Sequence, residues 1–246
     1  YGSKVSDKEV DKELAKQKKQ LGNQFDAYLA QQGLTEETAK KQIRSNMLLE
    51  YAVNQAAKKD IKESDYKAAF ESYTPEVTAQ IIKLDAEDKA KEVLEAAKAE
   101  GADFAQIAKD NSTDTATKDK GGEVKFDSGT ADIPSQVKEA AFKLDENGIS
   151  DVITVSAGQN YSASYYIVKL NKKTEKGSDW KKYVKRLKEI IVDGRKQDTN
   201  YIRSIIAKAM TNANIKVKDD AFKSTFNQYL QNIGVQTSDS SSSSKK

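Results

Sequence analysis

The sequence predicts an α+β protein in which helical segments from both ends of the chain flank a central stretch that also contains strands. Apolar residues recur at helical spacing through about the first 74 residues and again after residue 172. Short alternating stretches at 77–84 and 124–126 are typical of strands, and the run 165–170 is also interpreted as a strand. Hydrophobic residues make up 37% of the chain and charged residues 32%, which is typical of helices with wide solvated faces rather than of one large core.

The N-terminal part is expected to contain four helices. The first opens with Ser6 and Glu9 at the spacing of a capping box, in which each side chain satisfies a backbone group at the helix start. The fourth opens at Ser64. Proline disfavours helix in the residue before it, so Pro75 ends the pattern, and we assign residues 1–74 to a first helical part.

Two amphipathic helices are expected after the central stretch, separated near Asp193-Gly194. Their apolar stripes, like those of the N-terminal helices, need a partner. One such stripe, near the N-terminal end, comprises Ile43, Met47, Leu48 and Tyr51, and another, near the C-terminal end, comprises Tyr201, Ile202, Ile205, Ile206 and Ala209.

We therefore predict that residues 1–74 and 172–236 pack together into one mostly helical domain, with a domain of residues 75–171 inserted between them. The Ser-rich residues 237–246 cannot bury apolar area, so we predict that they form a disordered tail.

The stretch 111–150 carries the motifs of the central domain. A polar run with Ser112-Thr113-Asp114 leads to Gly121-Gly122, which indicates a turn or a close approach of two backbones. A short strand follows, and then a helix containing Ala140-Ala141-Phe142-Lys143-Leu144, which Asn147-Gly148 is expected to close.

The order and spacing of these motifs resemble the signature of parvulin-type peptidyl-prolyl isomerases, which implies a small antiparallel sheet with helices. The N-terminal runs V-S-D-K-E-V-D and Q-F-D-A-Y-L-A-Q-Q-G-L-T-E-E are similar to those of PrsA-type extracytoplasmic foldases, which are lipoproteins of Gram-positive bacteria. In that family the helices precede a single parvulin domain, and the helical domain resembles a crevice with apolar residues.

The resemblance also indicates candidate site residues. Family members carry two histidines on facing strands, and those positions hold Ile81 and Tyr166 in this chain, which has no histidine at all. The family's loop acid, the candidate catalytic residue, is retained as Asp114. The family's substrate-binding positions correspond to Phe126, Ile133 and Val137.

Each of these residues also has an ordinary structural explanation. An Asp in such a loop more often caps a turn than takes part in catalysis. Phe126, Ile133 and Val137 are equally well explained as core residues. Because the histidine pair is replaced, we expect prolyl isomerase activity to be weak or lost, and whether the domain is still an enzyme stays open.

The leading hypothesis is an extracytoplasmic foldase that acts mainly as a holding chaperone for unfolded or partly folded exported proteins. One alternative is an active peptidyl-prolyl cis-trans isomerase acting on X-Pro peptides. A second is a surface interaction protein or adhesin. A homodimer is left open.

The amino-acid composition limits which metals, cofactors and partners we expect. The absence of histidine and cysteine removes the commonest general base and the commonest metal ligands, so we expect no metal and no cofactor. Lys and Arg total 41 against 38 for Asp and Glu, and without a dominant basic block we expect no nucleic-acid partner.

The expected location follows from the resemblance. No apolar run approaches the ~20 residues of a membrane span. The chain shows no signal peptide, and Tyr1-Gly2-Ser3-Lys4 reads like the middle of a longer sequence, so we expect preceding residues. The family implies a lipid on an upstream cysteine, which would hold the protein at the interface between membrane and wall.

Overall fold

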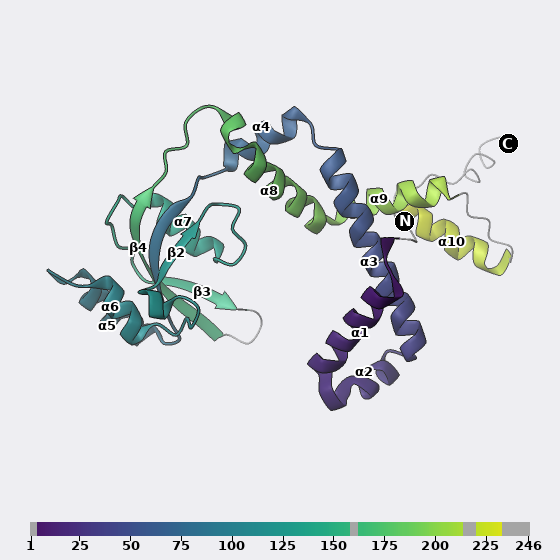
Figure 1. The fold of residues 1–246 in the computed structure, drawn as a ribbon, viewed down its shortest axis with the longest axis horizontal. Helices are drawn as coiled ribbons and strands as arrows, with labels where there is room; N and C mark the ends of the chain where they lie inside the picture. Colours follow the sequence, from purple (N-terminus) through teal and green to yellow (C-terminus); the bar gives the residue numbers. More distant parts are fainter. Residues whose placement is uncertain (1–3, 158–161, 214–219, 233–246) are drawn as a thin grey trace, which may run out of the picture. The chain divides into compact units, whose positions relative to one another are not determined.

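The computed structural model describes residues 4–157, 162–213 and 220–232 (Figure 1). Its contacts divide the chain into two compact units. The helical unit comprises Tyr1–Asp65 and Lys188–Lys246, and the sheet unit comprises Tyr66–Leu187. The predicted disordered tail at 237–246 lies outside the described residues.

Helices from both ends of the chain build the helical unit, as the sequence predicts. In chain order the helical elements at the two ends are α1 (Asp7–Leu21), the 3-10 turn η2 (Gly22–Gln24), α2 (Phe25–Gln31), α3 (Glu36–Lys59), α4 (Glu63–Ser72), α8 (Val184–Gln197), α9 (Thr199–Asn212) and α10 (Asp220–Asn232). Most of α4 and the first turn of α8 belong to the sheet unit. The unit boundaries fall within α4 and within α8.

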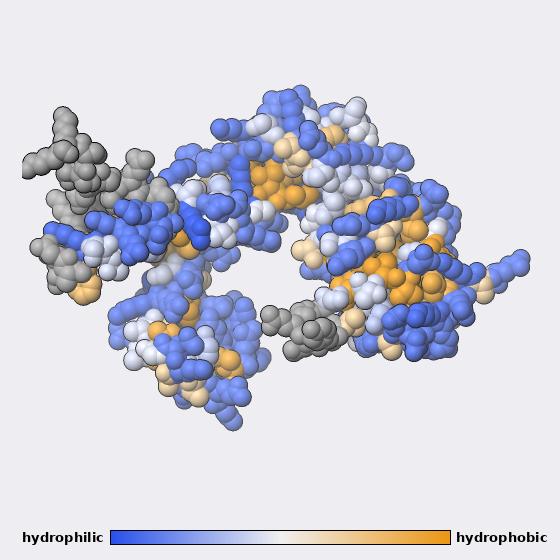
Figure 2. Space-filling view, turned by 180° about the vertical axis from the view of Figure 1, so that it is seen from behind, coloured by the Kyte–Doolittle hydropathy of each residue, from blue (hydrophilic) through white to orange (hydrophobic). Residues whose placement is uncertain are grey.

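The first three helices share a small apolar core. Val10 and Leu14 of α1 pack with Phe25 of α2 and Ile43 of α3. The predicted capping box is confirmed, because the Glu9 amide donates to the Ser6 hydroxyl at 3.3 Å and the Ser6 amide donates to the Glu9 carboxylate at 2.7 Å. Hydrophilic residues cover most of the helical surface in Figure 2, as the composition predicts.

The predicted break at Asp193-Gly194 is wrong, because α8 runs through Gly194 and ends at Gln197. A glycine inside a helix costs only about 1 kcal/mol relative to alanine. Arg195 fixes this part of the helix by donating to the Ala57 carbonyl at 2.9 Å and to Asp65 at 2.8 Å. The true break lies at Asp198, whose carboxylate accepts from the first free amides of α9.

The centre of the sheet unit is an antiparallel sheet with the strand order β2-β1-β4-β3. The strands are β1 (Val77–Leu84), β2 (Glu123–Phe126), β3 (Ile153–Ala157) and β4 (Ser162–Lys173). The remaining elements are α5 (Glu87–Lys98), α6 (Phe104–Asn111), η3 (Lys118–Lys120), α7 (Ser135–Lys143) and η5 (Trp180–Tyr183). The predicted α+β class is confirmed, and β3 is a strand that our sequence analysis missed.

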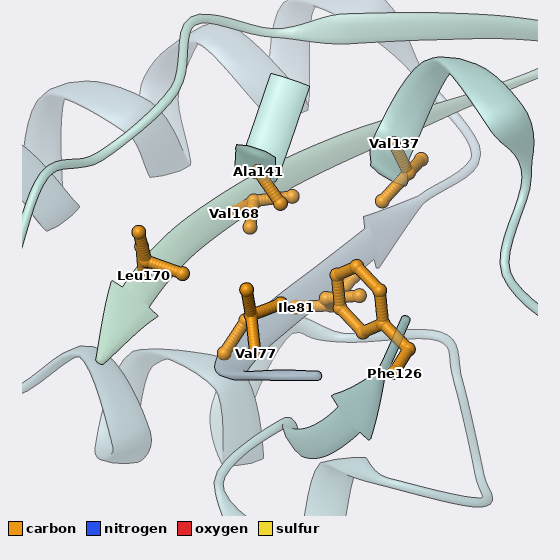
Figure 3. Close-up of a cluster of buried hydrophobic side chains, with 8 residues drawn as sticks. Val77, Ile81, Phe126, Val137, Ala141, Val168 and Leu170 are labelled. Atoms are coloured by element: carbon orange, nitrogen blue, oxygen red, sulfur yellow. The ribbon is translucent and has the colours of Figure 1, made fainter. Parts of the chain in front are cut away.

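Both faces of the central strand β1 are buried. Ile82 and Leu84 lie in the cluster formed with Phe104 and other residues of α5 and α6. Ile81 points to the other face, where it packs with Val137 of α7 (Figure 3). The alternation along β1 therefore serves two separate cores, one on each side of the sheet.

The glycine pair makes the predicted close approach. Gly121 and Gly122 have φ of +67° and +76°, in the left-handed region that favours glycine. A Cβ on Gly122 would lie 2.4 Å from the Ile81 carbonyl oxygen. The Ile81 amide donates to the Gly122 carbonyl at 2.9 Å, so the loop is tied directly to β1.

A buried ion pair connects the flanking helices to the sheet. Asp127, which directly follows β2, is 6% exposed and accepts from Arg186 of α8 at 2.6 and 2.8 Å. The Tyr73 hydroxyl donates to the same carboxylate at 3.2 Å, and Thr130 donates at 3.1 Å. The ring of Tyr73 in turn packs edge-on against Tyr183.

The charges in this network shift the pKa values of its members. Burial alone would raise the pKa of Asp127, but the Arg186 guanidinium and the donors Thr130 and Tyr73 outweigh it, so the pKa is lowered. Burial and the Asp127 carboxylate raise the pKa of the Tyr73 hydroxyl. The carboxylate is therefore held in its charged form inside the unit.

We predict that Arg186→Met lowers the free energy of unfolding by about 3 kcal/mol, because it leaves a buried carboxylate without its cation. The matched control is Lys98→Met, since its partner Asp151 has a side chain that is 92% exposed. That variant should lose less than about 1 kcal/mol. Urea unfolding at neutral pH measures both.

The stabilisation by the Asp127–Arg186 pair depends on pH, and the lowered pKa of Asp127 sets the direction of that dependence. Because the folded pKa of Asp127 is lowered, its stabilisation is present above the unfolded pKa of about 3.9 and is lost as the pH falls through the folded pKa. The difference between wild type and Arg186→Met should therefore shrink below about pH 4. Equal losses in Arg186→Met and Lys98→Met at neutral pH would contradict this account.

Candidate functional site

Except for Asp114, the candidate site residues taken from the family signature meet on one face of the sheet. Ile81, Phe126 and Val137 belong to a single buried cluster (Figure 3), and Ile133 and Tyr166 pack against its edge. They come from β1, β2, the loop before α7, α7 and β4. The structure thus brings together residues that are far apart in the sequence.

Most of this cluster is closed to solvent. Phe126 is 1% exposed and Val137 is 0% exposed. The Phe126 ring lies 5.8 Å from the ring of Phe142, centroid to centroid. Among the five candidate residues in this cluster, Ile133 and Tyr166 are half-buried, and Ile81, Phe126 and Val137 are core side chains.

The two positions that the resemblance assigns to the family's histidines lie diagonally across the β1–β4 ladder. Ile81 is paired with Val168, and Tyr166 is paired with Lys83 two residues further along β1. Diagonal neighbours on one face of an antiparallel pair lie within reach of long side chains. An isoleucine side chain has no hydrogen-bond donor or acceptor, so this diagonal pair cannot form the hydrogen bonds that two imidazoles would.

Asp114 has the geometry of a turn cap. Its carboxylate accepts from the Thr117 hydroxyl at 2.6 Å and from the Ala116 amide at 3.1 Å. Its backbone carbonyl accepts from the amide of Lys118 at 2.9 Å. These bonds shape the loop that leads to Gly121-Gly122, and a catalytic role for Asp114 stays a prediction.

Two polar residues that shape this region are not among the candidate site residues that the sequence indicates, although Ser112 belongs to the recognised Ser112-Thr113-Asp114 motif. Ser112 is 2% exposed, and its hydroxyl accepts from the amides of Lys83 and Asp114, which anchors the loop to β1. Asp127 forms the ion pair described above. The run Asp127-Ser128-Gly129-Thr130 directly after a strand is a turn signal that could have drawn attention to Asp127.

A groove lies in the helical unit between α3 and α9. Its volume is about 1050 Å³, and its walls are mainly apolar. The apolar lining residues are Leu48, Leu49, Ala52 and Ala56 of α3, Ile205, Ile206, Ala209 and Met210 of α9, and Ala213. Most of these side chains are half-buried, so the groove presents apolar surface that neither helix covers.

Parts of the two stripes that the sequence predicts line the groove. Leu48 belongs to the N-terminal stripe, and Ile205, Ile206 and Ala209 belong to the C-terminal one. The small side chain of Ala52 leaves room between the helices. Within the described ranges, none of the helices combines the length and hydropathy that a membrane crossing requires.

Comparison with known proteins identifies the sheet unit first. Residues 70–172 match the family model described as the PPIC-type PPIASE domain, or rotamase. The antiparallel sheet, the glycine loop and the helix α7 described above lie within this match. The sheet unit is therefore a parvulin-type domain.

Relatives that match nearly the whole chain identify the protein family more fully. A foldase protein PrsA from Streptococcus sanguinis is 61% identical over 95% of this chain and 70% of the relative. One from Streptococcus gordonii is 58% identical over 100% of this chain and 77% of the relative. The crystal structure of the foldase protein PrsA from Streptococcus pneumoniae is 54% identical, with a TM-score of 0.85, and covers 93% of this chain and 84% of its own.

The chain belongs to the PrsA family of parvulin-type foldases. Its function is accordingly that of a foldase or chaperone.

Proposed function

We propose that this foldase acts mainly by holding unfolded or partly folded exported proteins in the α3–α9 groove, and that its parvulin-type domain has weak or no prolyl isomerase activity. The proposal rests on a difference in exposure between the groove and the candidate proline pocket. The groove presents half-buried apolar side chains, whereas Phe126 and Val137 of the candidate proline pocket are enclosed in the core.

The groove has the properties of a site for holding client segments. Fully burying one large apolar side chain stabilises a complex by roughly 1.5–3 kcal/mol. A few such contacts against Leu48, Leu49, Ile206 and Met210 would hold an unfolded segment while allowing its release. Methionine is unbranched and flexible, which suits a surface that accepts varied side chains.

The parvulin-type domain lacks the groups that would favour rotation about the X-Pro bond. The barrier of ~18–20 kcal/mol comes from the partial double bond of the amide. An enzyme lowers it by binding the twisted amide better than the planar one. Ile81 offers no hydrogen bond, and the Asp114 carboxylate is already engaged by Thr117 and Ala116.

An active peptidyl-prolyl cis-trans isomerase is the alternative function. The match of residues 70–172 to the rotamase model favours it. In that case X-Pro peptides would bind at Phe126, Ile133 and Val137, which requires the closed cluster to open.

For the domain limits, we propose those that the sequence predicts: an inserted domain of residues 75–171 between helical parts at 1–74 and 172–236.

Two assays on one sample separate these functions. The full chain should suppress aggregation of an unfolded client at stoichiometric amounts, and it should accelerate proline-limited refolding far less than an active parvulin does. Ile206→Asp places a charge in the groove and should reduce aggregation suppression several-fold. Light scattering and refolding fluorescence measure the two activities.

The controls are matched to these outcomes. Tyr28→Asp changes an exposed aromatic residue of α2 outside the groove and should leave suppression unchanged. Asp114→Ala should leave suppression unchanged as well. If Asp114→Ala instead abolishes a parvulin-like refolding rate, the isomerase alternative is correct. If Ile206→Asp suppresses aggregation as well as wild type, clients do not use the groove.

We also propose that the protein works outside the cytoplasmic membrane of a Gram-positive bacterium, held by a lipid on a cysteine upstream of Tyr1. The support is membership of the PrsA family together with streptococcal relatives. Mass spectrometry of full-length protein extracted from membranes should show the acylated cysteine. An unmodified N-terminus in the soluble fraction would overturn this location.

A further inference from the structure

The rim of the α3–α9 groove carries an excess of positive charge. Lys58 and Lys59 line it from the end of α3, and Lys208 lines it from α9. Asp60 is the acidic residue among the lining residues. All four side chains are exposed. Within the described parts of the chain, none of the three lysines forms an ion pair.

The helix dipole explains the positions of only some of these lysines. Lysines in the last turn of a helix are favoured by the helix dipole, which explains Lys58 and Lys59. Lys208 lies before the last turn of α9, where the dipole has little effect. Its position beside an apolar groove rather than on the opposite face needs a different explanation.

We propose that the groove selects client segments in which apolar residues are flanked by Asp or Glu. The apolar residues would lie between α3 and α9, and the flanking carboxylates would meet Lys58, Lys59 and Lys208 at the rim. This inference rests on the proposed holding function and adds the chemical class of the client.

The shape of the site favours a polypeptide segment over a lipid surface. The apolar residues line a hollow of about 1050 Å³ between two helices. A chain segment can enter such a hollow, whereas a bilayer is contacted best by an apolar face that protrudes. Binding to anionic vesicles is therefore an outcome for the test to exclude.

The expected preference is modest and sensitive to salt. Exposed ion pairs are individually weak, and three of them should change the Kd by about five- to tenfold. Because exposed charges are screened over ~8 Å at physiological ionic strength and over less in stronger salt, the preference should nearly vanish in concentrated NaCl.

The test uses the full chain and two labelled synthetic peptides with the same apolar centre. One peptide is flanked by Asp and Glu, and the other by Lys and Arg. Fluorescence anisotropy at low salt should give a Kd about five- to tenfold lower for the acidic peptide. In the triple variant K58Q/K59Q/K208Q, the two Kd values should become nearly equal.

A second triple variant controls for net charge. K8Q/K12Q/K19Q removes three exposed lysines from α1, outside the groove, and should keep the preference for the acidic peptide. If both triple variants lose the preference equally, a long-range field rather than the rim selects the client, and the proposal is overturned.

The remaining outcomes are also decisive. Equal binding of the two peptides by wild type would overturn the acidic preference while leaving the holding function intact. If neither peptide binds, the holding function itself fails. If phosphatidylglycerol vesicles bind and K58Q/K59Q/K208Q abolishes that binding without affecting the peptides, the rim serves a lipid surface and the proposal is wrong.

Discussion

The sheet unit depends on one buried carboxylate that must keep its partners. Asp127 stands at the end of β2, and its charge is balanced by Arg186 of α8 and stabilised by Tyr73 at the end of α4. The next residues of the same loop accept from Lys138 of α7. A single turn thus connects the sheet to three helices, and the helices that flank the parvulin-type domain in sequence become part of its fold.

The need to keep Asp127 paired also affects the candidate site in the parvulin-type domain. Asp127 directly follows Phe126, and its loop leads on to Ile133 and Val137. Fixing this loop keeps Phe126 and Val137 in the core, where they are 1% and 0% exposed. The scaffold of a parvulin is therefore retained, whereas we propose that Ile81 and Tyr166 take the positions of the family's two histidines. We infer that the apolar surface for clients lies mainly in the helical unit.

Local chemistry in the sequence predicted much of the fold. The capping box at Ser6 and the close approach at Gly121-Gly122 follow from backbone requirements that few residues satisfy. The edge strand β3 was missed because it is short and half of its pattern, Thr154 and Ser156, is polar and exposed. The predicted end of the first C-terminal helix was wrong because it relied on Gly194, which a helix tolerates, rather than on Asp198, which caps the start of α9.

The site was harder to predict because its parts are joined only in three dimensions. Asp127 and Arg186 are 59 residues apart, and nothing in the local pattern of either predicts the pair. The stripes of α3 and α9 were recognisable from their spacing, but the groove arises from how these two helices pack. The resemblance assigns Phe126 and Val137 to pocket positions, and only their packing in one buried cluster with residues of β1, β4 and α7 shows that they are enclosed.

Amide hydrogen exchange of the full chain, with and without a saturating unfolded client, distinguishes binding in the α3–α9 groove from binding in the parvulin-type domain. If clients bind mainly in the groove, the client should protect amides of α3 and α9 around Leu49 and Ile206 and leave the exchange of β2 and α7 unchanged. Protection centred on Phe126 and Val137, with α3 and α9 unaffected, would contradict binding in the groove and would make the parvulin-type domain the site of client binding.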